Sequence, residues 1–486
     1  MSTNRLWTFA FLVPAFLVLG CSNANVQLND TRIPLQNRAR NNTRSAVFAE
    51  VASPADQDPA STLNVQNTVR PNSPSHADGE TPAGVIDKDG YFVGVALSGG
   101  GSRSANFSAA CMFQLERVGL MKHVDYISSV SGGSLAAAYY CAHGPDEWNP
   151  ANVQKHLSHA FATDLIFRSF LPWNIFAFTV SDWDRSDVLA GVFREQLFSE
   201  GGRPLTYADL RRDRPRLLIN STDLQTGRRF VFCNETFDEL NSDLSRYPLS
   251  YAVAASAAFP VVLHPVTLRD YSTIFPQYRH LIDGGVADNL GLQTLVETYV
   301  SQVESAAAAG RADPYPHGAV IVIINAQTKF NARLSSQSDL GLVASLSSSA
   351  GLTSHSLVNR ASSATLAETI VSNARDDVTA KELRAHIAEL DKNGFVSVID
   401  KTGHPVRVIY ISLSQLDSIK NLPFENFSEA VNTIDTYFNI KIEEAFNLYQ
   451  AADLIMKGGM EAHVRGIVQE IETGVPATQP ATVPSR

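Results

Sequence analysis

Two successive turns of this sequence carry residues that could perform acyl transfer. The glycine triplet 99–101 follows the apolar run 91–97, and Ser131 lies between the apolar run 124–130 and Gly132-Gly133. Backbone amides in a glycine-rich turn can point outward at an anion. A serine on a sharp strand-to-helix turn presents its hydroxyl at the positive end of the following helix. Together the two turns would place an anion hole beside a nucleophile, which acyl transfer requires.

Each turn connects a predicted strand to a predicted helix. The runs Tyr91–Leu97 and Val124–Val130 are too short for helices and rich in β-forming residues. Between them, Phe107, Cys111 and Leu115 fall on one helical face. The sequence therefore predicts two consecutive strand–turn–helix units.

The stretch from Tyr91 to Gln293 resembles the patatin-like phospholipases. Four blocks occur in order: the loop Ser98-Gly-Gly-Gly-Ser-Arg103, similar to the variant of the cytosolic phospholipase A branch, then the Ser131 turn, the segment Ala254–Pro260, and Leu281–Gly285, which matches the D-G-G/A of the family. The resemblance implies an α/β fold, a three-layer sandwich whose central, mostly parallel sheet is covered by helices on both faces.

The same resemblance implies roles for individual residues. Ser131 corresponds to the nucleophile and Asp283 to the base, and the amides of Gly99, Gly100 and Gly101 correspond to the oxyanion hole. An unperturbed aspartate, with a pKa of about 3.9, is a weak base, so burial in an apolar pocket would have to raise its pKa.

Alternative roles exist for both residues of this dyad. Ser131 could cap the following helix, and Asp283 could form the turn ahead of its two glycines. A Ser-His-Asp triad with His280 or His264 is a rival mechanism. His280 lies three residues before Asp283, so on a strand the two side chains point to opposite faces. Asp288 is interpreted as a helix N-cap.

The glycine loop also has a second interpretation. With Ser104 the triplet approximates G-x-G-x-x-G after a strand, the pattern of a dinucleotide site. No acidic residue ends the second strand, which weakens this interpretation. Arg103 could bind phosphate or brace the loop. Ser129, in place of the first glycine of G-x-S-x-G, adds a Cβ at a crowded turn.

Residues 1–21 have the pattern of a targeting segment. Arg5 precedes the apolar core Leu6–Leu19, which is shorter than the ~20 residues of a spanning helix. The sequence Val18-Leu-Gly-Cys21 resembles a bacterial lipobox, in which Cys21 would be lipidated. An ordinary cleaved secretory signal is the alternative. Either interpretation predicts export. In a lipoprotein, Ser22 after the cysteine favours the outer membrane as the destination.

The rest of the chain divides by composition. Residues 22–87 are polar and interrupted by prolines, so we expect a flexible tether, with a docked prosegment as the alternative. Residues 88–473 are expected to form one elaborated α/β domain and 474–486 a disordered tail. Further predicted elements are the strands 216–220, 230–233, 280–282, 319–324 and 406–412 and the helices 290–304 and 428–456.

The composition limits the kinds of partner. The net charge is −10 and only 18% of residues are charged, so neither nucleic acid nor anionic headgroups are favoured. Beyond Cys21, three cysteines (Cys111, Cys141 and Cys233) lack C-x-x-C spacing, so we expect buried free thiols, with one bridge as the alternative, no metal site and no cofactor.

Two stretches bear on substrate access. Leu165–Val180 holds five large aromatic side chains, typical of a lid, an acyl-chain channel or a buried helix broken at Pro172. The small-residue-rich stretch 340–364 fits a mobile cover or a packed helix equally well.

These observations predict a membrane-tethered, exported serine esterase that acts on lipid acyl esters, with phospholipids or lysophospholipids as its substrates. The alternative from another class is a lipid-binding or assembly lipoprotein that kept the fold and lost turnover.

Overall fold

The computed structural model describes residues 29–30, 89–260, 262–273, 275–328, 390 and 393–474. The predicted lipidation site Cys21, the stretch 340–364 and the tail beyond residue 474 lie outside the described residues, as does the predicted tether except for residues 29–30. No helix in the described part of the chain is both long and apolar enough to cross a membrane.

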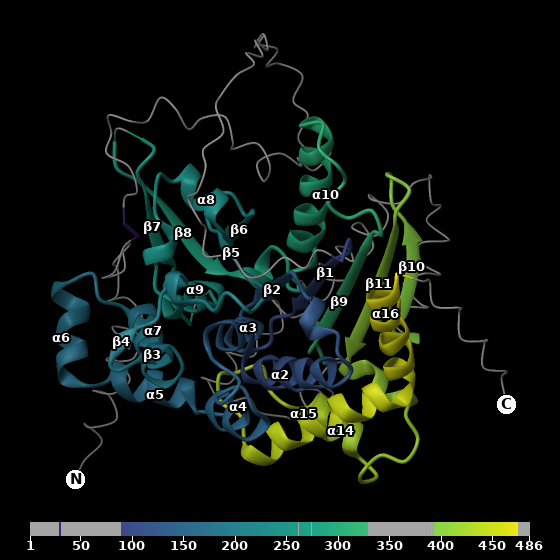
Figure 1. The fold of residues 1–486 in the computed structure, drawn as a ribbon. Helices are drawn as coiled ribbons and strands as arrows, with labels where there is room; N and C mark the ends of the chain where they lie inside the picture. The colour runs from purple at the N-terminus through teal and green to yellow at the C-terminus, as the bar shows by residue number, and fades with distance from the viewer. Residues whose placement is uncertain are drawn as a thin grey trace, which may run out of the picture.

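One mixed, nine-stranded sheet forms the centre of the domain (Figure 1). The strands lie in the order β10-β11-β9-β1-β2-β5-β8-β7, and β6 also pairs with β5. The five neighbours from β11 to β5 are parallel, whereas β10, β6, β8 and β7 pair antiparallel. The strands are β1 (Phe92–Leu97), β2 (Tyr126–Val130), β5 (Arg216–Asp223), β6 (Arg229–Phe232), β7 (Val266–Asp270), β8 (Gln277–Asp283), β9 (Ala319–Asn325), β10 (Phe395–Ile399) and β11 (Pro405–Ser412), with a separate hairpin of β3 (Ser199–Glu200) and β4 (Arg203–Pro204).

Helices cover both faces of this sheet. Figure 1 shows α10 on one side and α2, α3 and α15 on the other. The α-helices are α2 (Gly101–Arg117), α3 (Gly132–Ala142), α4 (Pro150–Leu157), α5 (Phe161–Ser169), α6 (Pro172–Val180), α7 (Arg185–Gln196), α8 (Asn234–Glu239), α9 (Leu249–Ser256), α10 (Leu292–Ala308), α14 (Phe427–Asn432), α15 (Ile442–Ile455) and α16 (Glu461–Thr473). Short 3₁₀ helices are η2 (Met121–His123), η3 (Tyr207–Asp209), η4 (Leu244–Arg246), η5 (Gly284–Val286) and η6 (Leu413–Ser418), and η7 (Met456–Met460) is a π-helix.

The central strand β1 shows why both faces are covered. Val93, Val95 and Leu97 are fully buried in the larger core cluster beneath α2 and α3, whereas Phe92 and Ala96 are buried in the smaller cluster beneath α10. Successive side chains of a strand point to opposite faces, so a strand that is apolar throughout needs cover on both. The predicted α/β architecture, with its mostly parallel central sheet and helices on both faces, is confirmed.

The predicted strands are all present, with ends that differ by one to three residues. The single helix predicted over 428–456 is wrong, because the chain leaves the helical path between α14 and α15. There the carbonyls of Ile434, Tyr437 and Phe438 accept hydrogen bonds from residues elsewhere in the domain instead of from helical amides. These tertiary bonds override a helical sequence pattern.

The aromatic stretch 165–180 holds the end of α5 and all of α6, so the helical path is broken at Pro172 as weighed from sequence. Pro172 opens α6, as its fixed φ and missing N–H allow. No residue of α6 is buried, so the interpretation of this stretch as a buried helix is wrong.

Cys111, Cys141 and Cys233 are buried free thiols. Burial raises the pKa of Cys141 and of Cys233 to about 12, so both are protonated and unreactive at neutral pH.

Candidate active site

Ser131 occupies the tight turn between β2 and α3. Its backbone has φ 49° and ψ −119°, a left-handed value that only three non-glycine residues of the described chain adopt. Such a conformation costs of order 1–3 kcal/mol and persists only when surrounding contacts impose it. The side chain makes no capping bond to α3. It instead donates a hydrogen bond of 2.8 Å from Oγ to Oδ2 of Asp283.

Gly132 and Gly133 are required because the backbone of the glycine loop lies too close to them for a side chain to fit. A Cβ on Gly132 would lie 2.0 Å from the carbonyl oxygen of Gly101, and one on Gly133 would lie 2.7 Å from the carbonyl oxygen of Ser98. The serine turn therefore packs directly on the glycine loop after β1. The register of β1 and β2, with Leu97 opposite Ser129, brings the two turns to the same edge of the sheet.

Asp283 reaches Ser131 from the end of β8. This strand pairs antiparallel with β5, with Asp283 opposite Ser221. Oδ1 of Asp283 accepts a hydrogen bond of 2.8 Å from the amide of Gly285, which leaves Oδ2 for the serine hydroxyl. The aspartate thus forms the turn into η5 and binds Ser131 at once, so the two roles weighed from sequence are compatible.

The electrostatic setting of Asp283 suits a base. The residue is 7% exposed, and its carboxyl has no ion-pair partner among the described residues. Burial raises the pKa of Asp283 to about 6, while the hydrogen bonds from the Gly285 amide and the Ser131 hydroxyl act in the opposite direction. Desolvation disfavours the charged carboxylate and so strengthens it as a proton acceptor.

The glycine loop differs from the expectation at one position. The amide of Gly99 donates a hydrogen bond of 2.9 Å to the carbonyl oxygen of Asn289, so it is not available to an oxyanion. The amides of Gly100 and Gly101 have no acceptor among the described residues. Their φ angles of 139° and 58° favour glycine. The predicted three-amide hole is therefore reduced to two candidate donors.

Arg103 braces the loop from inside the protein. It is 2% exposed, its Nε donates to the carbonyl oxygen of Ala326 at 2.9 Å, and its Nη1 donates to that of Ile434 at 2.6 Å. Desolvation lowers the pKa of Arg103 to about 10, so it is still charged at neutral pH. Of the two roles weighed from sequence, this geometry supports bracing rather than phosphate binding. Ser104 adds a bond of 2.5 Å to the carbonyl oxygen of Ser98.

Ser256 is a positioning residue that sequence reasoning did not identify. Its Oγ accepts a hydrogen bond of 2.8 Å from the amide of Ser131 and donates one of 2.6 Å to the carbonyl oxygen of Asn220. The residue lies at the end of α9, within the block Ala254–Pro260 that carried the family resemblance. That block was the available signal, because a serine at a helix end next to a strained turn can hold its backbone.

We expect Ser256→Ala to lower kcat about 10- to 100-fold while KM changes little. Without the acceptor, the strained amide of Ser131 is unsatisfied and its hydroxyl shifts relative to Asp283. Steady-state kinetics on a soluble ester measure kcat and KM separately. Ser134→Ala is the matched control, because the Ser134 hydroxyl contacts Ser256 Oγ at 3.1 Å, whereas the bond of Ser134 to Ser131 runs from its backbone amide to the Ser131 carbonyl and is kept in alanine. Equal losses in both variants would contradict the assignment.

The alternative interpretations find no support here. The direct bond between Ser131 and Asp283 leaves no position for an intervening imidazole, and His280 pairs with Thr267 on β7 instead. The start of α2 does not resemble a dinucleotide site. The amide of Ser102 donates to the carbonyl oxygen of Tyr437, so it is not available to a phosphate. A Cβ on Gly101 would lie 2.2 Å from the carbonyl oxygen of Thr436, so this segment covers the loop. No group of three or more potential metal ligands occurs among the described residues.

Asp288 has a structural role, as expected. Its Oδ1 accepts from the amide of Leu290 and its Oδ2 from that of Gln293, both at 3.0 Å, at the start of α10. Gly291, rather than Asp288, is the N-cap itself.

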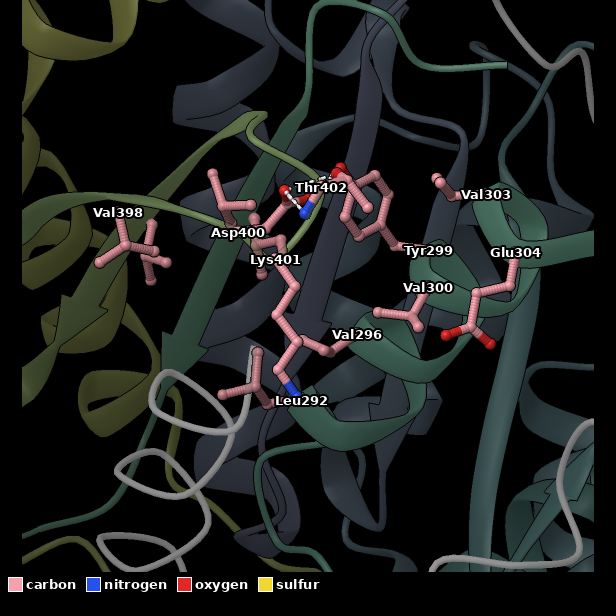
Figure 2. Close-up of a pocket in the computed structure, with 13 residues that line it drawn as sticks. Leu292, Val296, Tyr299, Val300, Val303, Glu304, Val398, Asp400, Lys401 and Thr402 are labelled. Carbon is pink, nitrogen blue, oxygen red and sulfur yellow. Dashed lines mark hydrogen bonds between the residues drawn. The ribbon is translucent and has the colours of Figure 1, made fainter. Parts of the chain in front are cut away.

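A separate apolar cavity lies between α10 and the β10–β11 hairpin (Figure 2). Its volume is about 90 Å³, and Figure 2 shows Tyr299 and Thr402 bonded to Asp400 at its wall. The lining residues Ile321 and Val406 belong to β9 and β11, whereas Ser131 and Asp283 are not among the lining residues. This cavity is therefore not the candidate active site.

The region that holds these residues was compared with known proteins. Residues 95–296 match the family model described as patatin-like phospholipase, and the matched range includes Ser131 and Asp283. A search of curated proteins gave no match.

Solved structures that resemble the chain include human GIVD cytosolic phospholipase A2 and VipD from Legionella pneumophila. The human enzyme is 12% identical over 79% of this chain and 61% of its own, with a TM-score of 0.46. VipD is 14% identical over 76% of this chain and 67% of its own, with a TM-score of 0.28. The present chain thus spans about 61% of the length of the human protein.

Proposed function

We propose that this protein is a lipid acyl hydrolase of the phospholipase A or lysophospholipase type, in which Ser131 is the nucleophile and Asp283 the general base. The observation that carries the proposal is the 2.8 Å hydrogen bond between these side chains at a buried, strained turn. The family match over residues 95–296 supports a lipid ester as the class of substrate.

In the acylation step, Ser131 Oγ attacks the ester carbonyl carbon while its proton passes to Oδ2 of Asp283. The negative charge on the carbonyl oxygen is stabilised by the amides of Gly100 and Gly101 and by the positive end of α3, which begins at Gly132. Each such donor contributes roughly 3 kcal/mol in comparable acyl-transfer enzymes.

Collapse of the tetrahedral intermediate releases the alcohol. Asp283 returns the proton to the leaving oxygen, and the acyl group remains on Ser131 as an ester. In the second half-reaction Asp283 takes a proton from the water that attacks the acyl-enzyme. As the intermediate collapses, Asp283 returns this proton to Ser131 Oγ, and the fatty acid leaves. One carboxyl thus serves as base and as acid in turn, without a histidine.

The pH dependence of kcat/KM follows from the raised pKa of Asp283. Only the ionised carboxylate can accept the serine proton, so we expect kcat/KM to fall tenfold per pH unit below about pH 6 and to level off above it. Rates on a soluble ester between pH 4.5 and 8.5 measure the profile. An inflection near pH 4, the ordinary aspartate range, would contradict the assigned environment of Asp283.

The substrate class is tested by hydrolysis of a lipid panel. Phospholipids, lysophospholipids and triacylglycerols are compared with the wild-type protein and with Ser131→Ala as the blank. The proposal expects fatty acid release from at least one phospholipid or lysophospholipid. Binding of these lipids without release of fatty acid would favour a lipid-binding or assembly lipoprotein instead.

We further propose that lipidation of Cys21 tethers the protein to the cell envelope, with the outer membrane as the expected site. The lipobox-like sequence before Cys21 supports this. We expect Cys21→Ser to block lipid attachment, so that metabolic labelling with a radioactive fatty acid is lost. Undiminished labelling of this variant would contradict the assignment.

A further inference from the structure

Six large apolar side chains of α5, α6 and the short connection between them face solvent. Ile166, Phe167, Phe170, Trp173, Phe176 and Val180 are each 58–67% exposed and are called the α5–α6 surface below. Burial of aromatic side chains is the rule in a folded domain, so a concentration of exposed ones within fifteen residues marks an interaction site.

The sequence of α6 gives this surface a single apolar face. Trp173, Phe176 and Val180 stand at positions i, i+3 and i+7, which lie along one side of a helix. Phe178 points elsewhere and packs against the core, which fixes the helix in place. No residue of α6 carries a charge.

We propose that the α5–α6 surface docks onto a phospholipid bilayer, inserting its aromatic side chains at the interface between headgroups and acyl chains. Trp and Phe on one face of a short helix are the residues that interfacial helices use. The protein is acidic overall, so this contact relies on apolar insertion and not on attraction to anionic lipids. The inference rests on the proposed function, because docking would serve to bring the active site to a lipid substrate in the membrane.

The hydrogen bonds of Asn29 to β7 and Tyr271, called the clasp below, favour a bilayer as the partner of the α5–α6 surface. Asn29 is 2% exposed, and its side chain bonds both the amide and the carbonyl of Arg269 on β7, at 2.6 and 2.9 Å. Its carbonyl also accepts from the hydroxyl of Tyr271 at 2.7 Å. Asn29 lies only eight positions after Cys21, a span of at most about 29 Å. A lipid on Cys21 would therefore hold the domain close to the bilayer.

The clasp and the α5–α6 surface lie on the same side of the molecule. Ser186, at the start of α7 just after α6, donates a hydrogen bond of 2.5 Å to the carbonyl oxygen of His264, which precedes the strand that holds Asn29. Figure 1 draws α6 and the short purple segment 29–30 both at the left of the view. A bilayer held near the clasp would thus lie on the side of the domain that carries α6.

The surface is also coupled rigidly to the candidate active site. The amide of Ala162, in the first turn of α5, donates to the carbonyl oxygen of Phe438 at 3.0 Å. The adjacent carbonyl of Tyr437 accepts from the amide of Ser102, in the first turn of α2 beside the glycine loop. Docking through α5 and α6 would thereby fix the orientation of the site relative to the membrane.

Quenching of Trp173 by brominated lipid tests the proposal. Full-length protein carrying Ser131→Ala, so that no lipid is consumed, is bound to phosphatidylcholine vesicles with bromine on the acyl chains. The difference between this protein and the same protein with Trp173→Phe isolates the emission of Trp173 from that of the other tryptophans. We expect at least twofold quenching of the Trp173 component. An unquenched Trp173 on vesicle-bound protein would overturn the proposal.

Hydrolysis rates of protein that retains Ser131 provide a second test of membrane docking. We expect Phe170→Ser/Phe176→Ser to lower hydrolysis of vesicle phospholipid at least fivefold and that of a monomeric short-chain ester less than twofold. The matched control is Ile442→Ser/Phe446→Ser, which changes residues 77% and 54% exposed on α15 and is expected to leave both rates within twofold. Equal effects of the two double variants on vesicle hydrolysis would contradict the assignment.

Other occupants give distinct results. Loss of monomeric-ester hydrolysis in the α5–α6 variant would mean that the surface serves the protein's own site. A wild-type dimer that the variant converts to a monomer, with Trp173 unquenched, would mean that a second copy covers it. Either result overturns the bilayer assignment. Because quenching is measured without turnover, failure of docking is distinguishable from failure of the proposed hydrolase function.

Discussion

Ser131→Ala is expected to lower the rate of ester hydrolysis at least about 10³-fold while the protein stays folded. The substitution removes the attacking oxygen, and no other hydroxyl is bonded to the carboxyl of Asp283 in the described chain, since Thr222 bonds only its backbone carbonyl. Alanine fits the space of the serine, and the strained backbone at φ 49° is still held by the bond from its amide to Ser256. Release of p-nitrophenol from a short acyl ester measures the rate.

Ser129→Ala is the matched control for this prediction. Ser129 lies two residues earlier, near the end of β2, and is fully buried, and its hydroxyl has no hydrogen-bond partner in the described part of the chain. Activity within threefold of wild type is expected from this variant. If Ser129→Ala abolished hydrolysis and Ser131→Ala did not, the nucleophile assignment would be wrong.

Asp283→Asn is expected to lower kcat about 10²- to 10⁴-fold with little change in KM, because the amide cannot accept the serine proton. The amide oxygen can still accept the hydrogen bond from Gly285, so the turn is preserved. The same hydrolysis assay measures the loss. Residual activity with an unchanged pH inflection near 6 would show that another group is the base.

The same variant is expected to be more stable than wild type at pH 8. The pKa of Asp283 is about 6 in the folded protein and near 3.8 in the unfolded chain, so its contribution to stability is fully present below pH 3.8 and is lost as the pH rises through about 6. A shift of this size corresponds to about 3 kcal/mol. Urea unfolding should show a stability gap at pH 8 that closes near pH 4. Stability and catalysis thus oppose each other at this position.

The sequence predicted the elements of the site because their signals are local. Short apolar runs followed by glycines or serine specify strand-to-helix turns, and four family blocks in order placed Ser131 and Asp283 at one edge of the sheet. Both turns follow parallel neighbours, β1 and β2, so the register between these strands brings them together. The resemblance of these blocks to a known family implied the dyad of Ser131 and Asp283.

The features that sequence reasoning missed depend on contacts between distant segments. Arg103 braces the loop through carbonyls 223 and 331 residues away. The amide of Gly99 is occupied by Asn289, and Ser256 reaches Ser131 across 125 residues. No local periodicity encodes such pairs. The exposure of α6 was missed for the same reason, since hydrophobicity alone cannot separate a buried helix from one that awaits a partner.

The most direct test of the central claim is the site of covalent modification by a fluorophosphonate, mapped by mass spectrometry of peptides. The claim predicts a single adduct on Ser131 in the wild-type protein, none in Ser131→Ala, and strongly reduced labelling in Asp283→Asn. Equal labelling of the wild-type protein and Ser131→Ala, or an adduct on another residue, would contradict it.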